Sequence, residues 1–89
     1  MIERTVLVQN KLGLHARASA RFVAEANKFP CYVGIKRDEL EVNGKSIMGV
    51  MMLAASVGSE IILITNGEQE EEAAAALEQL VNHRFGEPK

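Results

Sequence analysis

Four segments of the chain carry apolar residues in the pattern of β-strands. Within residues 2–9, Ile2, Val6 and Val8 fall on one face of an extended chain and polar side chains fall on the other, as in a strand with one buried face. Residues 60–65 are strongly apolar and also fit a strand. The predicted strands are residues 2–9, 31–36, 40–43 and 60–65.

Three other segments space their apolar residues as amphipathic helices do. Phe22, Val23 and Ala26 recur at helical spacing, which places them on one buried face, and Pro30 stops that helix. The predicted helices are residues 16–28, 47–55 and 68–85. The buried face of the last helix is predicted to contain Ala73, Leu77, Leu80 and Val81. We expect residues 86–89 to fray, as chain termini commonly do.

These elements follow one another in the order βαββαβα. Because each helix has one apolar face, the natural packing is an α+β open-faced sandwich, in which helices cover one face of a single sheet. A chain of 89 residues is long enough for one modest core. We therefore expect a single domain over residues 1–89.

The composition narrows the class of protein. The formal net charge of −2 argues against a general nucleic-acid binder, which is normally basic. The single cysteine, Cys31, excludes an internal disulfide, fits a reducing cytoplasm and lies in an apolar strand pattern typical of the core. Glu3 and Arg4 interrupt the start of the chain, so we expect no signal peptide, and no apolar run is long enough to span a membrane. We expect a cytoplasmic protein without membrane insertion.

The stretch from Lys11 to Ala20 joins a predicted strand to a predicted helix. Gly13 supplies the backbone freedom for a tight turn, and His15 stands at the N-cap position. A helix start presents unpaired N–H groups and the positive end of the helix dipole, so it favours an anion such as phosphate. Arg17 adds a permanent cation with a planar fork of donors.

Our hypothesis from these residues is that His15 becomes phosphorylated. A neutral imidazole keeps one ring nitrogen with a free lone pair, and the helix start and Arg17 both disfavour the imidazolium form. Once the phosphoryl group is attached, Arg17 and the backbone N–H groups of Ala16, Arg17 and Ala18 would stabilise its charge. A histidine that only caps the helix, an exposed loop histidine and a simple anion-binding site remain alternatives at this point.

Residues 47–53 carry more apolar side chains than one buried stripe of a short helix can hold. Some of them must therefore face outward, and methionine suits adaptable partner surfaces; the alternative is that all of them belong to the core. Basic residues near His15 would steer an acidic partner. The candidate basic rim consists of Arg17, Arg21 and Lys45.

Two motifs connect the chain with a known family. The stretch Gly13-Leu14-His15-Ala16-Arg17 resembles the active-site signature of the HPr family of histidine-containing phosphocarrier proteins, and the stretch from Asn43 to Met51 resembles that family's second signature. The spacing between the motifs also matches, and the resemblance covers essentially the whole chain. Ala18 departs from the pattern, because the family usually has proline at that position.

The resemblance implies a phosphocarrier of the phosphoenolpyruvate-dependent phosphotransferase system, which serves sugar transport. Such a protein is not an enzyme and needs no cofactor: it takes phosphoryl from enzyme I on His15 and passes it to IIA domains. A nitrogen-related, NPr-type regulatory carrier shares the same framework and remains an alternative. The resemblance further implies a monomer with a four-stranded antiparallel sheet under three helices.

Ser46 has two predicted roles. Its hydroxyl is a good N-cap for the helix that begins at Ile47. The stretch Lys45-Ser46-Ile47-Met48 also resembles the site at which a dedicated enzyme, HPr kinase/phosphorylase, phosphorylates family members in many bacteria. The resemblance favours Met48 and Met51 as partner contacts, and Ile47 lies beside them in the sequence.

Two rival classes fit the chain less well. A small RNA-binding module would need stacking aromatic residues and a basic face, whereas this chain has three Phe, one Tyr and a negative net charge. A metal-binding domain would need clustered ligands, and His15, Cys31 and His83 show no ligand spacing. The acidic residues within 68–72 fit a solvated helix start. We therefore expect no metal site and no nucleic-acid partner.

Overall fold

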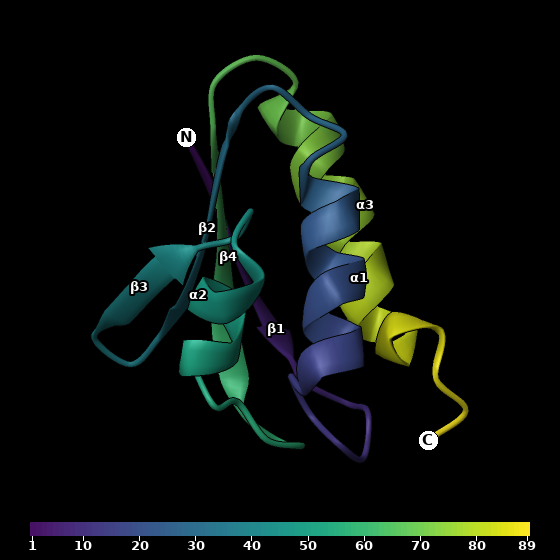
Figure 1. The fold of residues 1–89 in the computed structure, drawn as a ribbon. Coiled ribbons are helices and arrows are strands. Elements are labelled where there is room, and N and C mark those ends of the chain that lie inside the picture. Colours follow the sequence, from purple (N-terminus) through teal and green to yellow (C-terminus); the bar gives the residue numbers. More distant parts are fainter.

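The computed structural model describes residues 1–89. Its elements follow the predicted order, with a short 3₁₀-helix after the last α-helix (Figure 1). The strands are β1 (Ile2–Leu7), β2 (Tyr32–Arg37), β3 (Leu40–Asn43) and β4 (Glu60–Asn66). The helices are α1 (Ala16–Ala26), α2 (Ile47–Met52), α3 (Glu70–Asn82) and the 3₁₀-helix η1 (Arg84–Gly86).

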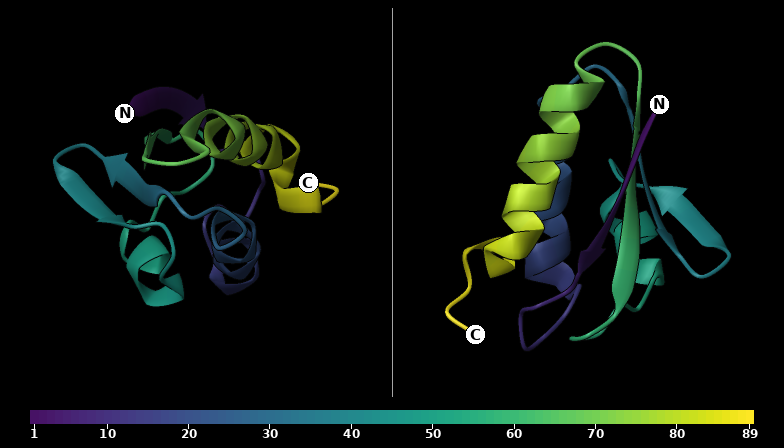
Figure 2. Two further views of the ribbon diagram at one scale, coloured as in Figure 1. Left: turned by 90° about the horizontal axis from the view of Figure 1, so that it is seen from above. Right: turned by 180° about the vertical axis from the view of Figure 1, so that it is seen from behind.

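The strands form one antiparallel sheet in the order β1-β4-β2-β3. Ile62 of the central strand β4 pairs with Thr5 of β1 on one side and with Lys36 of β2 on the other. The helices form a layer over one face of this sheet, with α1 between α2 and α3 (Figures 1 and 2). The predicted open-faced sandwich is therefore confirmed.

The core lies between the sheet and the helices. Phe22, Val23 and Ala26 of α1 are buried, as predicted, and Cys31 is a buried free thiol. On α3 the predicted residue Leu80 is only partly buried, whereas Ala73, Leu77 and Val81 are fully covered. The apolar side chains that line the sheet beneath the helices include Val6, Val33, Ile35, Val42, Ile61 and Leu63. The buried stripes predicted from periodicity therefore meet in one core.

Helix α2 ends earlier than predicted, at Met52 rather than Ala55. Ala54 has a φ of +50°, in the left-handed region that ends a helix. The guanidinium of Arg37 donates to the carbonyl oxygens of Leu53 and Ala54, at 2.9 and 3.0 Å. A side chain from the end of β2 thus satisfies carbonyl groups that the helix end leaves open.

Helix α3 is also shorter than predicted at both ends. Gln69 has a φ of +65°, so the helix begins at Glu70. It ends at Asn82, and the chain then turns through Arg84 and Phe85, which both have positive φ values. The predicted continuous helix is replaced at its end by this turn.

Gly86 and Glu87 are held in place, so the prediction that residues 86–89 fray is wrong for these two residues, whereas Pro88 and Lys89 are exposed and lie outside any helix or strand. Phe85 is buried in the core, and the Glu87 N–H donates to the carbonyl oxygen of Arg84 at 2.9 Å. These contacts keep the tail at the end of the molecule where the loop before α1 lies (Figures 1 and 2).

Tyr32 lies across the open face of the sheet. Its hydroxyl donates to Glu41 Oε2 at 2.6 Å, and its ring occupies the space that a side chain at Gly34 would need. The hydrogen bond to Glu41 is the main cause that raises the pKa of Tyr32, with burial and the Glu41 charge adding to it. Because the folded pKa is raised, this bond stabilises the fold below the ordinary tyrosine pKa and is lost as the pH rises through the folded value.

We predict that Glu41→Gln lowers the pKa of Tyr32 toward its ordinary value, because the charged acceptor is lost. The chain has one Tyr and no Trp, so the ultraviolet absorbance of the phenolate reports Tyr32 alone. Glu39→Gln, in the β2–β3 turn, serves as the control and should leave the titration unchanged. Equal midpoints in Glu41→Gln and the unmodified protein would contradict the assignment.

Candidate functional site

The loop that leads into α1 is fixed against the segment that follows α2. Gly13 has a φ of +68°, and a Cβ at this position would lie 2.4 Å from the carbonyl oxygen of Ala55. The next residue, Leu14, is buried and donates its N–H to that same oxygen at 2.9 Å. Only glycine fits this close approach. The close approach of Gly13 and the hydrogen bond of Leu14 together fix the position of the chain just before His15.

His15 is the N-cap of α1, as the sequence predicts. Its backbone is extended, with φ −78° and ψ −178°, and its Nδ1 accepts a hydrogen bond from the Arg17 N–H at 3.3 Å. The Ser19 N–H donates to the His15 carbonyl oxygen at 2.9 Å, whereas the N–H groups of Ala16 and Ala18 have no acceptor within the chain. The helix start therefore holds the ring by one donor and leaves two others free for an anion.

The other ring nitrogen faces the C-terminal tail. His15 Nε2 lies 2.6 Å from Glu87 Oε2. Because Nδ1 accepts from the Arg17 N–H, a neutral ring must carry its proton on Nε2, and Nε2 then donates to the carboxylate. The two nitrogens thus have different roles: Nδ1 keeps a lone pair toward the helix start, and Nε2 is a donor to Glu87.

Glu87 is held on both of its carboxylate oxygens. Asn10 Nδ2 donates to Glu87 Oε1 at 3.0 Å, while Oε2 faces His15. Burial raises the pKa of Glu87, but the hydrogen bonds from Asn10 and His15, with the charges of His15 and Arg21, outweigh it and leave the pKa of Glu87 below its ordinary value. The carboxylate is therefore ionised at neutral pH.

Asn10 links the tail to the loop. Its side chain is fully buried, and Nδ2 donates to the carbonyl oxygen of Gly13 at 2.7 Å as well as to Glu87. Both partners are acceptors, which fixes the orientation of the amide. Its Oδ1 has no hydrogen-bond partner, a situation that costs about 1–3 kcal/mol. The position of the amide is thus explained by its two donated hydrogen bonds, to Gly13 and to Glu87.

An open pocket of about 640 Å³ lies over the ring. Its lining residues are Lys11, Leu12, His15, Ala16, Arg17, Glu87, Pro88 and Lys89. Arg17 is exposed, and its guanidinium takes part in none of the ion pairs within the chain. Free donors, three basic side chains and a ring with a lone pair together suit the binding and covalent capture of an anionic group.

The outer face of α2 presents apolar side chains beside α1. Met48 is 73% exposed and Met51 39% exposed, and Ile47 is exposed as well, whereas Val50 and Leu53 are buried. The prediction that some of these residues face outward is therefore confirmed. Their contact with partners stays a prediction.

Ser46 caps α2 as predicted, because its Oγ accepts from the Gly49 N–H at 3.1 Å. The hydroxyl sits at the first turn of α2 and is partly exposed. Ser46 is therefore next to the exposed apolar face of α2, and its phosphorylation stays a prediction.

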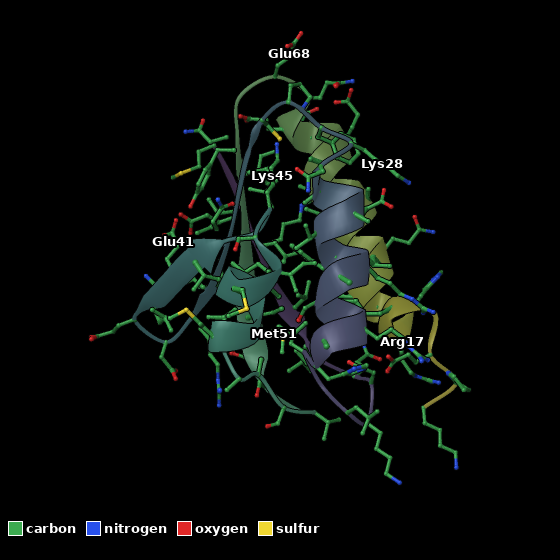
Figure 3. The ribbon with its side chains drawn as sticks, viewed as in Figure 1. Arg17, Lys28, Glu41, Lys45, Met51 and Glu68 are labelled. Atoms are coloured by element: carbon green, nitrogen blue, oxygen red, sulfur yellow. The ribbon has the colours of Figure 1, made fainter.

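The predicted basic rim is only partly formed, because Arg17 and Arg21 both lie near the C-terminal tail whereas Lys45 lies elsewhere. Arg21 donates to the carbonyl oxygen of Phe85, and Lys45 Nζ donates to the carbonyl oxygen of Phe29 at 2.6 Å. Figure 3 shows Arg17 at the end of α1 beside the tail and Lys45 toward the opposite end of that helix. Arg17 alone of the three lines the pocket.

The chain places no group of three or more His, Cys, Asp or Glu side chains where a metal ion could bind. Cys31 is buried, His83 is exposed beyond the end of α3, and neither lines the pocket over His15. None of the helices has the length and apolar character required to cross a membrane.

Sequence reasoning missed Glu87 and Asn10 as parts of the site. The one signal for Glu87 was Phe85, a large apolar residue next to Gly86 that had to be buried somewhere and would bring the following residues with it. Asn10 carried no signal, because its burial follows from contacts with Gly13 and with the tail.

Comparisons with known proteins show the family and the fold of this chain. The family model described as the PTS HPr component phosphorylation site matches residues 2–83. Phosphocarrier protein HPr of Pseudomonas aeruginosa is 55% identical over 83 residues, which cover 92% of each chain. The crystal structure of HPr-C-His from Thermoanaerobacter tengcongensis superposes with a TM-score of 0.96 at 45% identity and covers 100% of both chains.

Crh, a catabolite repression protein of Bacillus subtilis whose crystal structure is described as a domain-swapped dimer, is 46% identical, with a TM-score of 0.77 over 94% of this chain and 97% of its own. Family match, sequence identity and fold all point the same way. The chain belongs to the HPr family, the histidine-containing phosphocarrier proteins of the phosphotransferase system.

Proposed function

We propose that this phosphocarrier accepts a phosphoryl group from enzyme I on His15 and passes it to IIA domains. The observation that carries the proposal is the placement of the His15 ring at the start of α1, with one nitrogen toward the helix N–H groups. The chain acts as one phosphocarrier domain over residues 1–89, and its own side chain is the group that is modified. It is a carrier and not a catalyst.

Nδ1 is the nitrogen that takes the phosphoryl group. Its lone pair points to the helix start, where it accepts only one long hydrogen bond of 3.3 Å, while Nε2 is engaged by Glu87. The Nδ1 lone pair forms the bond to phosphorus as the bond between phosphorus and the donor breaks, and that electron pair leaves with the donor. Passing the group to a IIA domain is the reverse step with another acceptor.

The helix start and Arg17 stabilise the attached group. Its oxygens would replace Nδ1 as the acceptor for the Arg17 N–H and would also accept from the free N–H groups of Ala16 and Ala18. Ala18 has an N–H where the family usually has proline, so this chain offers one donor more than that pattern. The exposed guanidinium of Arg17 neutralises charge during transfer.

Partners dock on the exposed face of α2 beside the site. Met48, Met51 and Ile47 supply adaptable apolar contact area. Arg21 and Lys45 stay proposed partner contacts, and within the chain their charged groups donate to the backbone carbonyl groups of Phe85 and Phe29. The pocket over His15 is complete within one chain, so we propose that the protein works as a monomer, in the cytoplasm.

Phosphorylation of Ser46 by HPr kinase/phosphorylase would regulate the carrier. The modification adds about two negative charges at neutral pH, next to Met48 on the docking face. An acidic surface on enzyme I would then be repelled, which slows phosphorylation of His15.

We predict that enzyme I and phosphoenolpyruvate label the protein once, on His15. A phosphohistidine is labile in mild acid and a phosphoserine is not, so the acid stability of the label identifies its type. His15→Ala should abolish labelling, and His83→Ala is the matched control that should leave it intact. Label that persists in His15→Ala or survives mild acid would rule the assignment out.

We predict that Arg17→Ala slows transfer from enzyme I by roughly 10- to 100-fold, the rate equivalent of a hydrogen bond to a charged group. Because Arg17 is exposed and unpaired in the chain, the melting temperature should move by only a few degrees. Stopped-flow transfer rates and thermal unfolding measure the two effects. Lys28→Ala, beyond the far end of α1, is the control. A large loss of stability with an unchanged rate would refute this role.

We predict opposite responses to Ser46→Ala and Ser46→Asp. Ser46→Ala removes the cap and should cost about 1 kcal/mol of unfolding free energy, with little change in transfer. Ser46→Asp keeps a good cap but adds charge to the docking face, so stability should hold while transfer from enzyme I slows by about tenfold. Denaturant unfolding and initial labelling rates measure both. Equal transfer rates would remove the regulatory role and leave the cap.

A further inference from the structure

We propose that Glu87 is a positioning residue for phosphoryl transfer: it holds the Nε2–H tautomer of His15 and stabilises the charge of the ring once Nδ1 carries phosphoryl. The inference rests on the proposed function of His15 and adds a residue from the C-terminal tail to its site. No feature of the histidine motif itself supplies this group.

The contacts on the ring are consistent with one tautomer only. Nδ1 is an acceptor for the Arg17 N–H, and Nε2 lies 2.6 Å from Glu87 Oε2, close enough for a short hydrogen bond to the ionised carboxylate. The reverse tautomer would set two N–H donors against each other at Nδ1. The carboxylate therefore selects the form of the ring in which Nδ1 has its lone pair available.

The Glu87 carboxylate is held in position by contacts of the tail with the core and with Asn10. Phe85, two positions earlier, is buried in the core, and Arg21 donates to its carbonyl oxygen. The Glu87 N–H is bonded to Arg84, and the buried Asn10 amide holds Oε1. With 12% of its side chain exposed, Glu87 is more covered than His15, of which 27% is exposed. The backbone just before the contact and the other oxygen of the carboxylate are thus both held.

The carboxylate would stabilise the positive charge that the ring acquires during transfer. When Nδ1 forms its bond to phosphorus and the donor leaves with the electron pair of the broken bond, the proton on Nε2 stays, so the ring becomes cationic. An anion fixed at Nε2 stabilises that charge as it develops. A carboxylate on an imidazole nitrogen opposite the reacting one also orients the ring, as in hydrolase triads.

The charged residues around His15 and Glu87 support the role proposed for Glu87. Lys11, Arg17 and Lys89 line the pocket, and Glu87 is the only acidic side chain among its lining residues. An acid close to an incoming phosphoryl group would repel it, but Glu87 binds at Nε2, on a different edge of the ring from Nδ1. The basic side chains remain free for the phosphoryl group itself.

The test is Glu87→Gln, which keeps the size of the side chain and removes its charge. Enzyme I-dependent phosphorylation should show a kcat lower by roughly 10- to 100-fold, with the KM for this protein unchanged. In the unphosphorylated protein, ¹⁵N NMR of the His15 ring should show the Nε2–H tautomer alone before the change and a mixture after it, a readout that general destabilisation would not produce. Glu78→Gln is the matched control, because Glu78 pairs with Arg4 at 2.7 Å, away from the site.

The outcomes separate the possible roles. An unchanged kcat, or an unchanged tautomer, overturns the proposal. A faster reaction also overturns it, because Glu87 would then cover the ring instead of positioning it. If the unmodified protein is not labelled on His15, the proposed function itself is overturned. That result needs no substitution at Glu87, so it is distinguishable from failure of the proposal about Glu87.

Discussion

The hydrogen bond between the Arg17 N–H and Nδ1 of His15 is the contact on which the site depends. A helix begins with unpaired N–H groups, and here a histidine ring nitrogen takes the place of the usual cap oxygen. The cap fixes the side of the helix on which the ring lies and the direction of its lone pair. The placement of the ring at this candidate site then follows from one local backbone arrangement.

The cap can hold the ring only because the chain before it is fixed in turn. Gly13 and Leu14 lie against the carbonyl oxygen of Ala55, in the segment that follows α2. This segment is itself positioned by the guanidinium of Arg37 at the end of α2. The loop with His15 and the helix with the proposed docking face are thus connected through a short series of backbone contacts. A partner that binds α2 therefore meets the ring in a defined position.

The sequence predicted the features that depend on neighbouring residues. The alternation of Val6 and Val8, the stripe formed by Phe22, Val23 and Ala26, and the caps at His15 and Ser46 are all local patterns, and the structure contains each of them. These features are set by side-chain period and by the needs of a helix end, so one sequence suffices to find them.

The features that the sequence did not predict depend on contacts between distant parts of the chain. His15 and Glu87 are 72 positions apart, and Lys45 reaches the carbonyl oxygen of Phe29 instead of the pocket. The early end of α2 has the same origin, because a side chain of β2 satisfies its carbonyl groups. Where a long side chain finds its partner is decided by the packed fold and not by the residues beside it.

A phosphocarrier must expose its reactive group to several partners and still present it in one orientation. An exposed side chain normally samples several rotamers, and each reaction would then have to restrict the ring again. Here about a quarter of the His15 side chain is exposed (27%), yet both nitrogens are engaged, Nδ1 by the helix start and Nε2 by the tail. The cost of ordering the ring is therefore met during folding, while the pocket above it stays open.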